Sequence, residues 1–134
     1  MRIVLDTNVL ISGIFFSGPP FRILKAWKES RIQVVLSHEI LSEYQRVAEA
    51  LSVKYPEIEI APIIDLIIIY GEFIDANATT ACICDDPDDN KFIECALAGH
   101  CKIIVSGDKH LLKVSGYQGI TVLKPRDFVD LYLE

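Results

Sequence analysis

Short apolar runs alternate with helix-like segments along this sequence, and this alternation restricts the fold more than any other feature. Strands are predicted at Arg2–Leu5, Gln33–Leu36, Glu72–Asp75, Lys102–Val105 and Ile120–Leu123. Helices are predicted between them, at residues 21–30 and 38–51, from a start bracketed by Pro56 and Pro62 to about Tyr70, at 86–99 and 109–114, and from Pro125 onward. Such alternation is typical of a parallel sheet with helices on both faces. The 134 residues suit a single domain, with bounds 1–134.

The segment after Ser37 has the clearest helical pattern, and Ser37 is a suitable N-cap for it. One apolar face is formed by Ile40, Leu41, Tyr44, Val47, Ala48 and Leu51. In the helix at residues 21–30, the expected inner positions are Phe21, Leu24, Ala26 and Trp27. Gly18, Pro19 and Pro20 predict a turn before it, and residues 76–85 predict a loop.

The charge balance narrows the class of function. The chain has 13 Lys and Arg against 19 Asp and Glu, a formal net charge of −6. A protein that holds nucleic acid by bulk positive charge is therefore disfavoured. A nuclease remains compatible, because two divalent cations give −6 + 4 = −2 and reverse the field at an acidic site.

Neither of the two most apolar runs predicts a membrane span. Val9–Phe16 is too short, and Ile60–Tyr70 carries Asp65 near its middle. Asp6 interrupts the first apolar stretch, so we expect no signal peptide, no membrane contact and a cytoplasmic location. Four cysteines lack the paired spacing of a zinc site, and we interpret them as free thiols: Cys82, Cys84, Cys95 and Cys101.

Acidic side chains gather at the expected carboxyl edge of the sheet, where open parallel sheets bind their ligands. Asp6 directly follows the first strand, and Asp108 lies just past the fourth. Glu43 lies in the second turn of the helix after the second strand. Three further acids crowd the start of the helix that ends at Gly99: Asp86, Asp88 and Asp89.

Asp89 falls within the apolar face of its helix, and an inward carboxylate is costly unless something compensates it. A structural explanation is a capping box, with Asp86 as the N-cap and Asp89 as its reciprocal partner. That explanation does not account for the other acids, although Glu43 alone would be interpreted as an ordinary rim glutamate. Several acids at one edge repel one another unless a cation joins them.

Mg²⁺ and Mn²⁺ prefer carboxylate oxygens, and a pair of such ions can activate a water and stabilise the leaving oxygen of a phosphodiester. No Ser, Cys or His is placed for covalent catalysis, so a metal-dependent hydrolase is favoured. Lys91 and Lys109 lie near the acids and would be able to steer a phosphate backbone.

Four short motifs resemble, in order, those of the PIN-domain family, and together they cover nearly the whole chain. The motifs are Leu5-Asp6-Thr7-Asn8-Val9, Ser42-Glu43-Tyr44, Asp86-Pro87-Asp88-Asp89-Asn90-Lys91-Phe92 and Val105-Ser106-Gly107-Asp108. Each is weak alone, but the ordered set is specific. Within the family, the sequence is similar to the VapC-like toxins of toxin–antitoxin pairs.

The resemblance implies a three-layer α/β/α sandwich whose parallel five-stranded sheet has the order 3-2-1-4-5. It implies an endoribonuclease that depends on one or two Mg²⁺ or Mn²⁺ ions. Members of the family commonly form homodimers, and the toxins bind an antitoxin protein, so both partners are expected here beside the RNA substrate.

The resemblance also implies roles for individual residues. The catalytic and metal-binding residues would be Asp6, Glu43, Asp89 and Asp108, with Asp86 as an additional metal-binding acid. Asn8 and Ser106 would orient Asp6 and Asp108. Ser106 stands where the family more often has Thr, and the hydroxyl group is retained.

Three other functions compete with this interpretation. A phospho-acceptor receiver domain is imitated by Asp6, Asp75, Ser106 and Lys124-Pro125, but it leaves Glu43, Asp89 and Asp108 without a role. A phosphatase of the haloacid dehalogenase type would need a second Asp at position 8, which is Asn8. A PIN fold that binds RNA or protein without cutting is the third, and the four costly acids argue against it.

Overall fold

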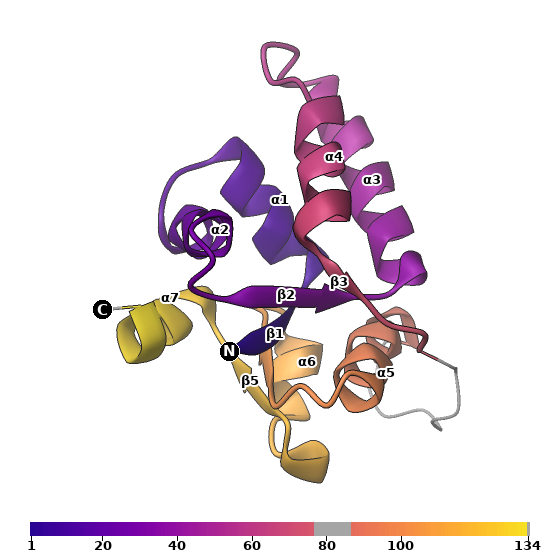
Figure 1. The fold of residues 1–134 in the computed structure, drawn as a ribbon, viewed down its shortest axis with the longest axis vertical. Coiled ribbons are helices and arrows are strands. Elements are labelled where there is room, and N and C mark those ends of the chain that lie inside the picture. Colours follow the sequence, from indigo (N-terminus) through magenta and orange to yellow (C-terminus); the bar gives the residue numbers. More distant parts are fainter. Residues whose placement is uncertain (77–86, 134) are drawn as a thin grey trace.

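The computed structural model describes residues 1–76 and 87–133 (Figure 1). Its five parallel strands have the order β3-β2-β1-β4-β5, which confirms the predicted topology. The strands are β1 (Arg2–Leu5), β2 (Gln33–Leu36), β3 (Glu72–Phe73), β4 (Ile103–Val105) and β5 (Thr121–Leu123). Residues 77–86, which hold most of the predicted loop together with Cys82, Cys84 and Asp86, lie outside the described residues.

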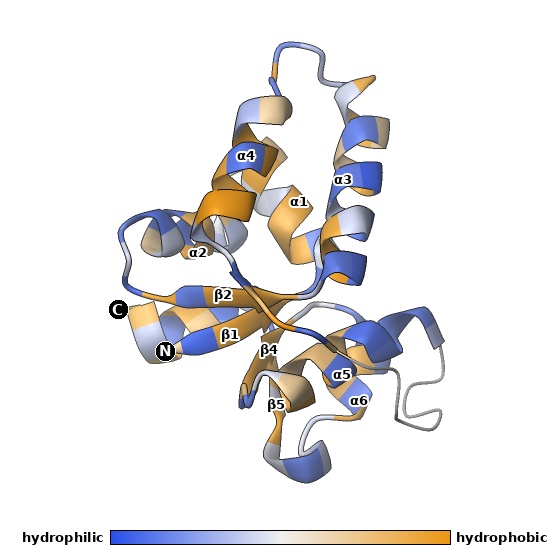
Figure 2. Ribbon diagram, turned by 45° about the vertical axis from the view of Figure 1, so that its right-hand side comes forward, coloured by the Kyte–Doolittle hydropathy of each residue, from blue (hydrophilic) through white to orange (hydrophobic). Residues whose placement is uncertain are grey.

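Helices cover both faces of the sheet, so the molecule has three layers. The helices are α1 (Thr7–Phe15), α2 (Pro19–Lys28), α3 (His38–Ser52), α4 (Ala61–Tyr70), α5 (Asn90–Ala98), α6 (Lys109–Lys113) and α7 (Pro125–Phe128). Short turns of other helical types lie at Pro87–Asp89, Tyr117–Gly119 and Val129–Leu133. Figures 1 and 2 show α1 to α4 on one side of β1 and β2, and α5 and α6 on the other.

This strand order is incompatible with the receiver interpretation. A receiver-type fold has the flavodoxin-like order 2-1-3-4-5, in which the third strand lies directly beside the first. Here β2 separates β3 from β1, and β3 is the edge strand. Asp75, the supposed phosphate acceptor, therefore follows an edge strand instead of a neighbour of β1.

Helix α1 covers residues 7–15, a segment for which the sequence pattern predicts no helix. This segment, TNVLISGIF, is apolar on nearly every side and so lacks the one-sided period that identifies a surface helix. It is buried because α1 packs against both α2 and α3. After Arg2, strand β1 is likewise apolar and buried at each position, since helices cover both of its faces.

Two details of α2 also differ from the prediction. The helix begins at Pro19, so the two prolines form its first turn instead of a preceding turn. Phe21, an expected inner residue, is 50% exposed, because Ile23, Ala26 and Trp27 form the buried face.

Among the described residues, no helix is both long and apolar enough to cross a bilayer.

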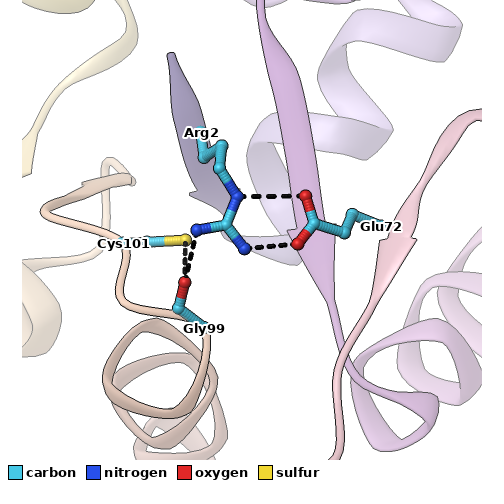
Figure 3. A network of polar contacts seen from close by, with 4 residues as sticks. All are labelled: Arg2, Glu72, Gly99 and Cys101. Atoms are coloured by element: carbon cyan, nitrogen blue, oxygen red, sulfur yellow. Dashed lines mark hydrogen bonds and ion pairs between the residues drawn. The ribbon is translucent and has the colours of Figure 1, made fainter.

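A polar network around Arg2 links neighbouring elements at the end of the sheet opposite Asp6 and Asp108 (Figure 3). Arg2 Nε donates to Glu72 Oε1 at 3.0 Å, and Arg2 Nη1 donates to the carbonyl oxygen of Gly99 at 2.6 Å. The hydrogen bond from Arg2 lowers the pKa of Glu72. The network joins β1, β3 and the carboxyl end of α5.

The two cysteines in the described part of the chain, Cys95 and Cys101, are buried free thiols, as expected. Burial raises the pKa of Cys95 to about 12, and the charge of Cys101 adds to the increase. A thiol with so high a pKa is unreactive at neutral pH.

Candidate active site

Asp6 lies at the carboxyl end of the central strand, between β2 and β4. Its backbone N–H donates to the carbonyl oxygen of Val105 at 3.0 Å, which fixes it against β4. Its side chain is buried, with the residue only 4% exposed. Burial raises the pKa of this carboxyl group, a hydrogen bond from Ser106 partly opposes the increase, and the charges of Asp108 and Glu43 add to it.

Ser106 joins two of the predicted site residues. Its Oγ donates to Asp6 Oδ2 at 2.7 Å and accepts from the backbone N–H of Asp108 at 2.9 Å. Ser106 is fully buried, so both contacts are shielded from water. Ser106 therefore links the carboxylate of Asp6 to the backbone of Asp108.

Asp108 is also the N-cap of α6. Its Oδ1 accepts a hydrogen bond from the backbone N–H of His110 at 2.7 Å. This oxygen therefore stabilises the helix start. Asp108 still contributes charge to the site, because it raises the pKa of Asp6.

Glu43 is held from two other helices. Thr7 Oγ1, at the start of α1, donates to Glu43 Oε2. Lys91 Nζ, on α5, lies 2.7 Å from Glu43 Oε1. Residues from α1, α3 and α5 thus meet at this carboxylate.

Two polar groups place Glu43 beside the end of β1. Ser37 caps α3 as predicted, because its Oγ accepts from the backbone N–H of Ile40 at 3.3 Å. Tyr44, fully buried, donates its hydroxyl to the carbonyl oxygen of Leu5 at 2.6 Å. The second turn of α3 is therefore attached to the residue that precedes Asp6.

Thr7 and Tyr44 are site residues that the sequence analysis did not identify. Tyr44 belongs to the second motif and to the apolar face of its helix, and the signal for its role is that a buried tyrosine hydroxyl usually needs an acceptor. Thr7 stands inside the first motif, next to Asn8, for which the resemblance implies an orienting role. In the structure Asn8 is exposed, and no hydrogen bond joins it to Asp6 among residues 1–76 and 87–133.

Asp89 lies at the start of α5, two residues before Lys91. It is 8% exposed, and its Oδ2 atom is shielded from solvent. As the N-cap of α5, its side chain makes no hydrogen bond to the first turn of that helix, while the predicted capping box with Asp86 involves a residue that the structure does not describe. It is not among the charges that raise the pKa of Asp6, whereas Asp108 and Glu43 are. Asp86 lies outside the described residues.

The chemistry of these residues fits a hard divalent cation, although the side chains do not form a closed cage. Within the described part of the chain, no three His, Cys, Asp or Glu side chains lie close enough together to hold a metal ion. The available donors are oxygens of carboxylates and hydroxyl groups, which Mg²⁺ and Mn²⁺ prefer. A cation beside the buried Asp6 would offset the repulsion from Asp108 and Glu43.

Comparisons with known proteins agree with this fold. A family model described as PIN domain matches residues 2–110. The uncharacterized protein MJ1680 of Methanocaldococcus jannaschii is 34% identical over 119 residues, which cover 85% of this chain and 75% of that protein.

Two solved structures share the fold at low sequence identity. The first is VapBC2 from Rickettsia felis, solved bound to a DNA fragment from its promoter. It matches with a TM-score of 0.61 and 16% identity, and the match covers 92% of this chain and 98% of that chain. The PIN domain of T. brucei RRP44 matches with a TM-score of 0.53 and 16% identity, over 98% of this chain and 81% of that one.

Proposed function

We propose that this chain, which belongs to the PIN-domain family, is a nuclease. In this proposal it hydrolyses RNA with the help of Mg²⁺ or Mn²⁺. PIN domains are generally nucleases. The observation that carries the proposal is Asp6, a buried carboxylate whose pKa is raised by burial and by two neighbouring acids. A purely structural residue would not need a charge in that position, since burying it costs free energy.

In this proposal Asp6, Glu43, Asp89 and Asp108 bind the cation, and Asp86 assists them. A bound cation would supply a water activated for attack and would stabilise the leaving oxygen of the phosphodiester. Ser106 holds the carboxylate of Asp6 in one orientation, and Thr7 does the same for Glu43. Because Ser106 and Thr7 hold them in place, the carboxylate oxygens of Asp6 and Glu43 would need little rearrangement when a cation binds.

The test is cleavage of a labelled single-stranded RNA by the purified protein, with Mn²⁺ and with EDTA. We expect cleavage only with Mn²⁺. Asp6→Asn and Asp89→Asn should each reduce it roughly 100-fold or more, as the loss of other charged stabilising groups does. Glu43→Gln should impair cleavage, whereas Glu49→Gln, an exposed acid further along the same helix, should leave it intact.

Full cleavage by both aspartate variants would contradict the assignment of the site. RNA binding without cleavage by the wild-type protein would instead support a silent PIN fold. A DNA oligonucleotide of the same sequence, run in parallel, tests the preference for RNA.

An apolar cavity of about 190 Å³ lies between α1, α2 and α4 and supports the expectation of a partner protein. It is lined by Leu10, Ile14, Leu24, Trp27, Ile63 and Leu66, among others. We propose that the chain is the toxin of a toxin–antitoxin pair and that an apolar antitoxin segment fills this cavity, with both proteins in the cytoplasm. The similarity to VapBC2 supports this pairing. Co-purification with the product of an adjacent small gene, lost in Leu24→Asp, would test it.

A further inference from the structure

We infer that Lys91 competes with the divalent cation for Glu43, so that the ammonium group occupies the cation position of the metal-free site and the metal displaces it. The inference rests on the proposed function, since it concerns the same site. It assigns to Lys91 a regulating role that is distinct from metal binding and from catalysis.

The first support is the geometry of the ammonium group. Lys91 Nζ lies 2.7 Å from Glu43 Oε1 and donates to the carbonyl oxygen of Asp88 at 2.7 Å. It also lies 5.6 Å from the centre of the Phe92 ring. The side chain is only 12% exposed, and that of Glu43 17%. This ion pair is therefore poorly screened by water, unlike an ordinary surface pair.

The second support is that both oxygens of Glu43 are already engaged. Thr7 Oγ1 donates to Oε2, and Lys91 takes Oε1. A divalent cation that binds Glu43 directly has to share Oε1 with a positive charge at hydrogen-bonding distance. Two cations on one oxygen repel strongly in a poorly hydrated site. Binding of the metal and the ion pair of Lys91 must then weaken each other by the same factor.

Arg46 provides an internal comparison. Its Nη2 lies 3.8 Å from the same oxygen, Glu43 Oε1, but its side chain is 74% exposed. Water and salt screen a charge in that position. Arg46 and Lys91 thus present the same charge to the same carboxylate oxygen, and they differ in distance and burial.

A competing explanation is that Lys91 only holds Glu43 in place for the metal. The two explanations predict effects of opposite sign. If Lys91 competes, removing its charge strengthens metal binding. If Lys91 only positions Glu43, removing it lets the carboxylate move and weakens metal binding.

The experiment measures the dissociation constant for Mn²⁺ by electron paramagnetic resonance, without any substrate. We expect Lys91→Met to bind Mn²⁺ about tenfold more tightly than the wild type, within the usual range of coupling between two ligands. Lys91→Arg, which retains the charge, should stay near the wild-type value. Arg46→Met should change the constant about twofold or less, because its charge is screened.

Unchanged or weaker binding by Lys91→Met would overturn the inference while leaving the nuclease proposal standing. Absence of Mn²⁺ binding in the wild type and in Lys91→Met would overturn both.

A second measurement uses only the wild-type protein, so it does not depend on the folding of a variant. Lysines are acetylated with a water-soluble succinimidyl ester at increasing Mn²⁺, and each site is quantified by mass spectrometry. Displacement predicts that Lys91 reacts faster as Mn²⁺ binds, while Lys102, an exposed lysine just before β4 at the opposite end of the sheet, serves as the internal reference. A Lys91 rate that is constant, or that falls with Mn²⁺, relative to Lys102 contradicts displacement.

Discussion

At the scale of single residues, Asp6 is the position where the proposed function and stability conflict most clearly. Its carboxyl group is buried, and two acids raise its pKa further. Asn at this position would remove the charge and keep an oxygen that accepts the hydrogen bond from Ser106. The metal-free protein should therefore gain stability from a change that is expected to remove the proposed cleavage, a trade-off common at functional sites.

We predict that Asp6→Asn raises the free energy of unfolding of the metal-free protein by about 1 kcal/mol at pH 7. Because the pKa of Asp6 is raised in the folded state, the folded protein binds the extra proton between the ordinary value of 3.8 and the raised one. The wild type should thus lose stability as the pH rises through the raised pKa, and the variant should not show this loss.

Guanidinium unfolding in EDTA from pH 4 to pH 8 measures this difference. Asp65→Asn, which removes an exposed charge from α4, is the control and should follow the wild type. A variant that is less stable than the wild type across the whole range would show that the charge of Asp6 is stabilised by the fold itself.

At the scale of elements, α3 places Glu43 at the candidate site because its first two turns are fixed. Ser37 caps the helix, and Tyr44 attaches it to the end of β1. The one-sided pattern of α3 is strong, and the sequence therefore predicts this helix and its cap correctly. The same rule fails for α1, since a helix that is apolar on all sides has no face to detect.

We predict that Ser37→Ala lowers the free energy of unfolding by about 1 kcal/mol, the usual cost of losing an N-cap. Ser42→Ala, in the same helix, should change it by about 0.5 kcal/mol or less, because Ser42 is exposed and bonds only the carbonyl oxygen of His38. Urea unfolding compares the two variants. Equal losses would mean that the cap adds nothing specific to α3.

At the scale of the whole molecule, α4 leaves apolar surface uncovered. Ile68 and Ile69 are 45 and 69% exposed, whereas Leu66 and Tyr70 line the cavity between α1, α2 and α4. Figure 2 shows this helix as largely hydrophobic beside the mixed α3. Large exposed apolar side chains that lie together are typical of a protein–protein contact. The expected homodimer would bury Ile68 and Ile69 and leave the cavity to the proposed antitoxin.

We predict that the wild-type protein is dimeric in light scattering after size exclusion and that Ile69→Glu makes it monomeric at the same concentration. Ile69 is the most exposed apolar residue of α4, at 69%. Val53→Glu, at a position 83% exposed just past the end of α3, should leave the mass unchanged. A monomeric wild type, or an Ile69→Glu variant that stays dimeric, would contradict a dimer through α4.

The sequence predicted the fold better than it predicted the contacts around Asp6, Asp108 and Glu43. Strand positions follow from local pattern, but the order 3-2-1-4-5 required the family resemblance, because pattern does not say which strands pair. The contacts of Thr7, Tyr44 and Lys91 join residues 36 to 48 positions apart in the chain, so no local rule reveals them.

The hydrogen bond between Ser106 and Asp6 spans 100 positions. It has a consequence for the cell that makes this protein. While the ribosome is still adding residues before β4, the nascent polypeptide holds Asp6 and Glu43 but has neither Ser106 nor Asp108. In the proposed nuclease, the site would therefore stay incomplete during most of translation, and the messenger RNA would meet a competent molecule only after the fourth strand has emerged and docked.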